Sequence, residues 1–170
     1  MADVFSVSKR SDVMSRIRGR GNKATEVEFL RLLRIHGITG WRRHMSLPLP
    51  KATGATGTSK RPRVRPDFVF PKSKVAIFVD GCFWHGCPTH CTAPASNVVF
   101  WRAKLAGNRE RDRRVSRLLR QQHWAVLRFW EHQLQHGDRV ITRLRLTLDR
   151  PPIVPETRSS TSQDAARPRS

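Results

Sequence analysis

Three cysteines and two histidines stand close together in one short segment, Gly81-Cys82-Phe83-Trp84-His85-Gly86-Cys87-Pro88-Thr89-His90-Cys91. Thiolates and imidazoles are preferred ligands of Zn²⁺, and structural zinc sites usually hold four of them in a tetrahedron. Cys82 and Cys87 with either His90 or Cys91 would supply three ligands. His132, which follows a later apolar run, is a candidate for the fourth if that run pairs as a strand beside the one at 75–79, and Cys91 is the competing candidate. The segment therefore predicts a structural zinc site, and free thiols packed in a core are the alternative.

Carboxylates are scarce in this chain, so their positions carry information. Asp67 begins a short apolar run after Arg65-Pro66, and an acidic residue at a strand end can hold Mg²⁺ through its oxygens. His85 adds a group whose ordinary pKa of about 6.5 suits proton transfer near neutrality. Asp112 lies within an arginine-rich run at 108–114. These residues indicate phosphodiester chemistry, whereas a strand-start aspartate and a solvated helix face are the plainer interpretations.

The charge of the chain points to a polyanionic partner. Its 170 residues include 33 Lys+Arg and 13 Asp+Glu, for a formal net charge of +20. Arginine supplies most of the excess, and its planar guanidinium suits bidentate phosphate contacts. The N-terminal residues have no apolar core typical of a secretory signal, and no apolar run is long enough to span a membrane. We expect a cytoplasmic protein without disulfides.

Apolar periodicity predicts one α/β domain over residues 1–150. Two helices are expected between Ser11 and Ile35, the second capped by Thr25 and ending at Gly37. The remaining expected elements are a short strand at 41–47, a basic flexible loop at 51–66, a β-hairpin of strands 67–70 and 75–79, a helix at 100–122 interrupted near Gly107, a strand at 124–130, a helix at 138–148 and a disordered tail at 151–170.

Aromatic residues adjoin the cysteine cluster. Phe83 and Trp84 follow Cys82 directly, so a bound metal would hold them on a rigid loop. An aromatic wedge of this kind can enter stacked bases, and stacking is worth about 1–3 kcal/mol per base. Core packing is the alternative, particularly for Trp101.

Taken together, these motifs resemble the very short patch repair (Vsr) DNA mismatch endonucleases. The resemblance covers about residues 8–135 and is most specific in two blocks, Cys82–His85 and Asn108–Arg114. The other matching motifs are Met14-Ser15-Arg16-Ile17 with Arg20, Glu26, Arg65-Pro66-Asp67-Phe68-Val69, Phe100-Trp101 with Lys104, and Trp124-Ala125-Val126-Leu127 with Trp130-Glu131.

The resemblance implies a restriction-endonuclease-like fold and a Mg²⁺-dependent nick on the 5′ side of the thymine in a T:G mismatch. It implies that Asp67 is the catalytic metal-binding carboxylate and that the backbone carbonyl of Val79 faces the same metal. It further implies that His85 is the general base and that Glu26 supports the water shell of the metal. Asp112 would orient the histidine or the water network, and Asp80 is a further candidate for the magnesium site.

The resemblance also implies ligands and partners. Cys82, Cys87, His90 and His132 would bind zinc, with Cys91 as the alternative to His90. The residues implied in DNA contact or intercalation are Met14, Phe83, Trp84, Trp101, Asn108, Arg109 and Arg113. A monomer in the bacterial cytoplasm, associated with the nucleoid and cooperating with a MutL-type repair protein, is expected. The alternatives are a restriction-type or other structure-specific nuclease and a non-catalytic, zinc-braced DNA-binding protein.

Overall fold

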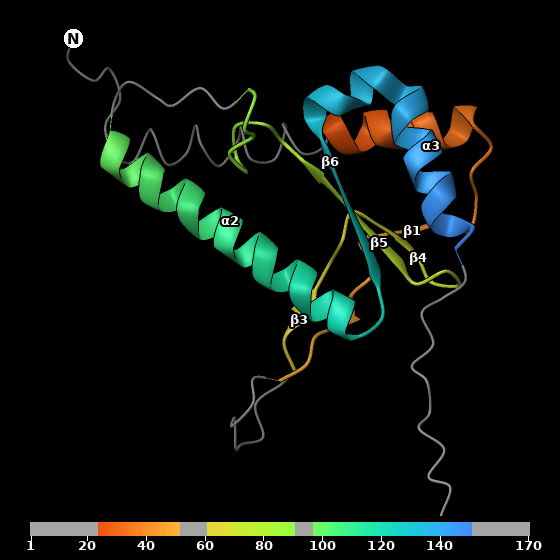
Figure 1. Cartoon of the computed structure of the whole chain (residues 1–170), viewed down its shortest axis with the longest axis horizontal. Helices are drawn as coiled ribbons and strands as arrows, with labels where there is room; N and C mark the ends of the chain where they lie inside the picture. Colours follow the sequence, from red (N-terminus) through yellow and green to blue (C-terminus); the bar gives the residue numbers. More distant parts are fainter. Residues whose placement is uncertain (1–23, 52–60, 91–96, 151–170) are drawn as a thin grey trace, which may run out of the picture.

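A mixed four-stranded sheet forms the centre of the protein, whose computed structural model describes residues 24–51, 61–90 and 97–150. The strand order is β1-β4-β5-β6, with β5 and β6 parallel and the other two pairs antiparallel (Figure 1). The strands are β1 (Arg42–Arg43), β4 (Phe68–Phe70), β5 (Val75–Asp80) and β6 (Ala125–Trp130). A separate antiparallel ribbon pairs β2 (Leu47–Pro48) with β3 (Arg63–Val64).

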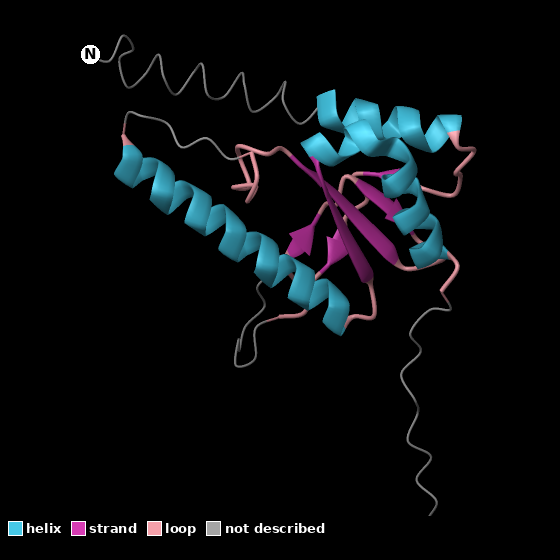
Figure 2. Cartoon of the chain, turned by 45° about the horizontal axis from the view of Figure 1, so that its top comes forward, coloured by secondary structure: helices cyan, strands magenta, loops and turns pink. Residues whose placement is uncertain are grey.

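Helices cover both faces of the sheet. A helix over residues 24–35 and α3 (Gly137–Leu148) lie on one face, and the long α2 (Val98–Gln121) crosses the other (Figure 2). The short 3₁₀ helix η1 (Glu131–His136) connects β6 to α3.

Side-chain alternation along β5 explains the two layers. Val75, Ile77 and Val79 belong to the core beneath the 24–35 helix and α3, whereas Ala76 and Phe78 belong to the core beneath α2. Successive strand residues point to opposite faces, so a strand covered on both sides is apolar throughout. The structure is thus a mixed α/β fold with a central sheet flanked by helices. Among the described residues, no helix has the length and apolar character needed to cross a membrane.

The expected hairpin, the strand ending at Trp130 and the last helix are confirmed. The interruption near Gly107 is wrong, because α2 runs through this position without a break. A helix-interior glycine costs roughly 0.5–1 kcal/mol relative to alanine. Burial of Trp101 and Leu105 before it and of Leu119 after it holds the helix together.

Three further expectations near the N-terminal half are corrected. Thr25 is not a helix cap, because Ala24 is already helical and Thr25 is buried within the helix. The segment 41–47 contributes two short strands to different sheets, separated where His44 adopts a positive φ of 49°. The end of the 51–66 loop is not flexible, because Arg63–Val64 pairs with β2. The helix expected after Ser11, residues 52–60 and the tail 151–170 lie outside the described residues.

Strand register brings the chemically interesting residues to one edge of the sheet. Phe68 pairs with Ile77 in the antiparallel β4–β5 ladder, so Asp67 lies beside the carboxyl end of β5. Asp80 pairs with Trp130 in the parallel β5–β6 ladder. Parallel strands end at the same edge, which places the loop after Asp80 next to the start of η1.

Two glycine substitutions should have opposite effects on stability. A Cβ added at Gly137 would lie 2.5 Å from a methyl carbon of the buried Leu32, whereas one at Gly107 meets nothing within 4 Å. We expect Gly137→Ala to lower the free energy of unfolding by about 1–3 kcal/mol through overpacking. Gly107→Ala should raise it by about 0.5–1 kcal/mol. Urea unfolding of both variants checks this, and a Gly137→Ala protein as stable as the parent would contradict the close packing of the two helices.

Candidate active site and metal centre

Asp67 lies at the centre of a small group of polar side chains at the sheet edge. Its Oδ2 accepts a hydrogen bond of 2.7 Å from the backbone N–H of Val79. Ligating atoms of Glu26 and His44 come from the 24–35 helix and the residue after β1, and they lie within 4.8 Å of one another and of the Asp67 carboxylate. Glu26 is held by Arg43 and by His44, whose Nε2 is 3.1 Å from its Oε2.

The two carboxylates fit a Mg²⁺ ion, which prefers oxygen ligands and usually keeps several waters. Burial raises the pKa of Asp67 from 3.8 to about 6, and the negative charges of Glu26 and Asp80 add to the shift, while the Val79 N–H opposes it. A buried carboxylate surrounded by other carboxylates stores unfavourable electrostatic energy that a divalent cation would relieve. Glu26 and Asp67 thus form one group that could hold the ion, and Asp80 belongs to a second such group with His85 and Asp112.

A second group of four residues follows directly along the edge. The Nδ1 of His85 lies 2.6 Å from Oδ2 of Asp112 and 3.5 Å from Oδ1 of Asp80. The guanidinium of Arg128, from β6, lies 3.1 Å from Asp112 and 3.3 Å from Asp80 and stacks on the ring of Phe78. We call His85, Asp80, Asp112 and Arg128 the His85 network.

Hydrogen bonding within the His85 network fixes the chemistry of the imidazole. Donation of the Nδ1 proton to Asp112 leaves Nε2 of the neutral ring with a free lone pair. Burial alone would raise the pKa of Asp112, but the hydrogen bond from His85 and the charge of Arg128 outweigh it and hold this pKa below its usual value. Asp112 is therefore ionised near neutrality and can orient His85 as a proton acceptor.

Asp67 and the His85 network open into the same cleft. This cleft has a volume of about 430 Å³, and Asp67, Asp80, His85, Asp112 and Arg128 all line it. Its walls also carry arginines from β3, the residue after it and α2, namely Arg63, Arg65, Arg111 and Arg114. An acidic centre with a basic rim suits a phosphodiester whose charge is neutralised as it approaches the carboxylates.

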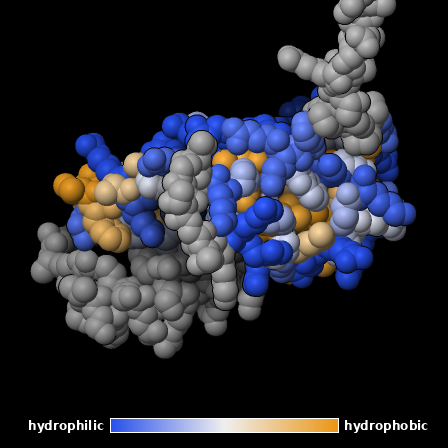
Figure 3. Space-filling model, turned by 90° about the horizontal axis from the view of Figure 1, so that it is seen from below, coloured by the Kyte–Doolittle hydropathy of each residue, from blue (hydrophilic) through white to orange (hydrophobic). Residues whose placement is uncertain are grey.

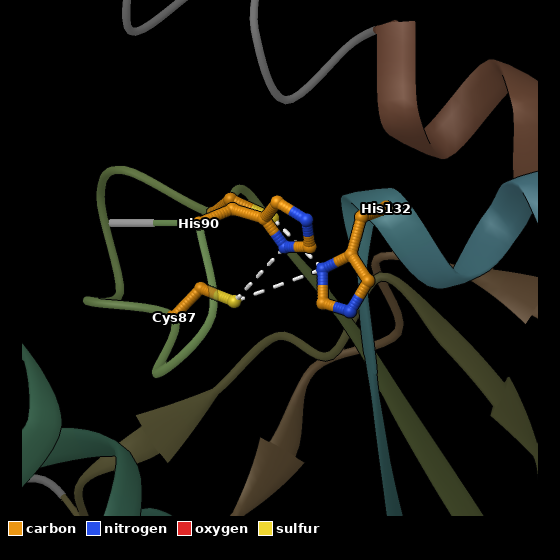
Figure 4. Close-up of side chains that lie close together, drawn as sticks. Cys87, His90 and His132 are labelled. Carbon is orange, nitrogen blue, oxygen red and sulfur yellow. Dashed lines mark hydrogen bonds between the residues drawn. The ribbon is translucent and has the colours of Figure 1, made fainter. Parts of the chain in front are cut away.

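The cysteine loop and the start of η1 form a third polar group. Cys82 and His132 stand two residues beyond Asp80 and Trp130, which are paired in the β5–β6 ladder. The Sγ of Cys82 lies 3.2 Å from Nδ1 of His132, and the Sγ of Cys87 lies 3.7 Å from the same nitrogen. His90 completes the group through Nδ1 at 3.9 Å from Cys87 (Figure 4).

These four side chains fit a tetrahedral zinc site. Ligands at the usual zinc distances of 2.0–2.3 Å lie about 3.3–3.8 Å from one another in a tetrahedron, close to the observed separations. The four ligating atoms all fall within 4.8 Å. Burial and the neighbouring His90 lower the pKa of His132, so its ring is neutral, as a metal ligand must be. The competing candidate Cys91 lies outside the described residues.

The aromatic residues of the loop pack on one another and on α2. Ring centroids of Phe83 lie 5.1 Å from Trp84 and 5.2 Å from Trp101. Trp101 is 7% exposed, so it would have to leave this cluster to enter DNA. Figure 3 shows an apolar group at the end of the molecule where α2 begins, and the exposed apolar residues at the start of α2 are Val98, Val99 and Phe100.

Comparison with known proteins identifies the family. A sequence model described as DNA mismatch endonuclease Vsr matches residues 57–92. The DNA mismatch endonuclease Vsr of Escherichia coli K12 is 34% identical over 143 residues, which are 82% of this chain and 80% of that protein. The chain belongs to the Vsr family of DNA mismatch endonucleases. A Vsr relative from Neisseria meningitidis serogroup A, the type II nicking enzyme V.NmeAIP, is 33% identical over 86% of this chain and 92% of its own length.

Some Vsr relatives match over a shorter region. The type II nicking enzyme V.NaeI of Lentzea aerocolonigenes is 52% identical over 71 residues, 42% of this chain. That match spans 43% of V.NaeI, and matches to two further nicking enzymes span 64% and 62% of their lengths. The chain thus spans about half the length of these relatives.

The structure of this Vsr-family chain brings most predicted site residues together, but in separate groups. Asp67 and Glu26 form one, whereas Asp80 contacts His85 and Arg128 in the other. Val79 contacts Asp67 through its N–H, and the role of its carbonyl stays a prediction.

The residues predicted to contact DNA are placed differently from one another. The amide of Asn108 donates a 2.8 Å hydrogen bond to the carbonyl of Trp84, so in this structure it supports the aromatic loop. Arg109 and Arg113 are exposed on α2. Met14 lies outside the described residues.

Two residues at the site were missed by sequence reasoning. His44 joins Glu26 and Asp67, and Arg128 ties Asp80 to Asp112. Arg128 carried a usable signal, because it is the one charged residue within the apolar run 125–130. A charge inside a strand covered on both faces requires a partner. No comparable signal marked His44.

Loss of Arg128 should disrupt the His85 network. Arg128→Met would leave two buried carboxylates facing each other, so we expect endonuclease activity to fall about 10- to 100-fold and stability to fall by about 2 kcal/mol. The double variant Asp80→Asn/Arg128→Met should recover part of that stability, since one charge of the pair is then gone. Urea unfolding of the four-member cycle measures the coupling. Strictly additive effects would show that Asp80 and Arg128 do not interact.

Proposed function

We propose that this protein is a Mg²⁺-dependent DNA endonuclease that nicks one strand on the 5′ side of the thymine in a T:G mismatch, the product of 5-methylcytosine deamination. The observation that carries the proposal is the opening of Asp67 and the His85–Asp112 pair into one basic cleft. Family membership supports the mismatch as substrate, since the Escherichia coli relative is named a DNA mismatch endonuclease.

Each residue of the site has its own role in hydrolysis. Nε2 of His85 accepts the proton of the attacking water, while Asp112 holds the ring and stabilises the imidazolium that forms. Asp67 and the carbonyl of Val79 would hold Mg²⁺, and Glu26 would support its water shell. The ion would neutralise charge at the scissile phosphate. The rim arginines bind the flanking phosphates. The net result is addition of water across one P–O bond.

Zinc and the aromatic cluster have positioning roles in this proposal. His85 lies between Cys82 and Cys87, so a zinc ion held by these thiolates with His90 and His132 would fix the loop that carries the base. Phe83 and Trp84 would stack beside the mismatch, joined by Trp101 after rearrangement and opposed by Met14. Residues 1–150 act as one restriction-endonuclease-like domain, and the protein works as a cytoplasmic monomer with a MutL-type repair partner.

A nicking assay tests the proposal. One end-labelled duplex with a single T:G pair in a CpG-containing context is compared with its C:G control, with Mg²⁺ and with Ca²⁺ in its place, which spares the zinc site. We expect one cut, 5′ of the mismatched thymine, with Mg²⁺ alone. Equal cutting of both duplexes would indicate a restriction-type nuclease, and tight binding without any cut would indicate a non-catalytic DNA-binding protein.

A further inference from the structure

A second basic pocket adjoins the His85 network but does not include Asp67. Its volume is about 410 Å³. We call it the α2 pocket and define it by Gly86, Arg109, Arg113, Ser116, Arg120 and Arg128. Four residues, Asp80, His85, Asp112 and Arg128, line both this pocket and the cleft that contains Asp67, so the two cavities are adjacent and share a wall.

The arginines of the α2 pocket form a regular stripe. Arg109, Arg113, Ser116 and Arg120 are spaced i, i+4, i+7 and i+11, which places them along one face of α2. Among the described residues, the three arginines have no carboxylate partner. The carboxylates of the pocket, Asp80 and Asp112, are already engaged by Arg128 and His85. The pocket therefore carries an uncompensated positive charge.

The loop next to His85 packs against one of these arginines. Gly86 has a positive φ of 64°, and a Cβ added there would lie 3.3 Å from Nε and 3.4 Å from Cζ of Arg109. The guanidinium thus lies directly against the loop backbone, one residue from His85. A guanidinium whose movement is limited by a neighbouring backbone loses less entropy on binding an oxyanion than an arginine free on all sides does.

We propose that the α2 pocket binds a phosphate of the DNA backbone that neighbours the cleaved phosphate on the same strand. This inference rests on the proposed function, because it assumes that the cleaved phosphate lies at Asp67. Several guanidinium groups converging on one cavity suit the tetrahedral phosphate, which accepts charge-assisted hydrogen bonds from several directions. The common wall with the Asp67 cleft brings the next phosphate of a continuous strand within reach, and its capture there sets the register of the strand against His85.

Phosphate neutralisation combined with arginine removal tests the pocket. T:G duplexes with one neutral methylphosphonate at each backbone position of either strand are bound to the parent, Arg113→Ala and Arg120→Ala proteins without Mg²⁺. Arg117→Ala is the matched control, because Arg117 is exposed on the same helix and lines neither cavity. We expect a methylphosphonate at one position beside the nick to weaken DNA binding by the parent about tenfold. The same methylphosphonate should not weaken binding further in Arg113→Ala or Arg120→Ala, because these variants already lack the contact.

The outcomes separate this proposal from the proposed function. Arg117→Ala should keep the full sensitivity to methylphosphonate, since it removes the same charge outside the pocket. The pocket proposal is overturned if all three variants keep this sensitivity, if the sensitive position lies on the uncut strand, or if submillimolar inorganic phosphate competes with DNA, which would indicate a free-anion site. Failure of the parent protein to nick any duplex would instead overturn the proposed function. One phosphate whose neutralisation weakens binding of the parent and of Arg117→Ala, but not of Arg113→Ala or Arg120→Ala, would still support a phosphate site in the pocket.

Discussion

Asp67→Asn should reduce nicking of a T:G duplex by about 10³-fold or more while leaving DNA affinity within a few-fold of the parent. The substitution removes the charge that Mg²⁺ needs but keeps an oxygen that can accept the Val79 N–H. Single-turnover nicking and a binding titration measure the two effects separately. A variant that nicks at the parental rate would show that Asp67 is not a catalytic residue.

The same substitution should stabilise the protein in the absence of divalent metal. Burial raises the pKa of Asp67 to about 6 from 3.8, so folding favours the protonated carboxyl. The stability that this preference contributes is present below about pH 4 and is lost as the pH rises through about 6. A shift of this size corresponds to about 3 kcal/mol, so Asp67→Asn should be more stable than the parent by up to that amount at pH 8.

Urea unfolding from pH 4 to 8 checks this linkage. The gap between Asp67→Asn and the parent should open between pH 4 and 7 and then level off. Mg²⁺ should stabilise the parent and narrow the gap, with no comparable effect on the variant. A gap that stays constant with pH would show that Asp67 titrates normally.

Cys87→Ser should release the expected zinc ion and strongly reduce nicking. The parent is expected to hold one zinc ion per chain, and loss of one of four ligands should lower that content to near zero. Because His85 lies between Cys82 and Cys87, its position depends on both ligands, and we expect at least a 100-fold loss of activity. The free energy of unfolding should fall by about 3 kcal/mol, or roughly 10 °C in Tm. Metal analysis by mass spectrometry, the nicking assay and calorimetry measure the three effects.

Cys91→Ser is the matched control for the zinc site. It changes the same atom four residues away and should keep both zinc and activity, because His90 completes the group in the structure. His90→Ala should lose zinc. The opposite pattern, with zinc lost in Cys91→Ser and kept in His90→Ala, would assign the fourth position to Cys91.

Much of the fold could be predicted from local patterns. The run 75–79 is apolar at every position, which is typical of a strand covered on both faces, and the structure buries all five of its residues. Pairing of β6 beside β5 was the condition on which His132 was proposed as a zinc ligand, and the parallel ladder meets it. The continuity of α2 through Gly107 could not be read locally, because distant contacts of the helix decide it.

The sequence by itself determined which chemical groups are available: a cluster of cysteines and histidines, one strand-start carboxylate, the histidine within that cluster and an arginine-covered helix. The tertiary structure decided which of these groups come together in each side-chain cluster. Asp67 joins Glu26 and His44 from segments 23 to 41 residues away, while His85 joins Asp112 and Arg128 from α2 and β6. Sheet register and helix packing set these distances, and no local spacing encodes them, because each group combines elements that meet only when the core forms.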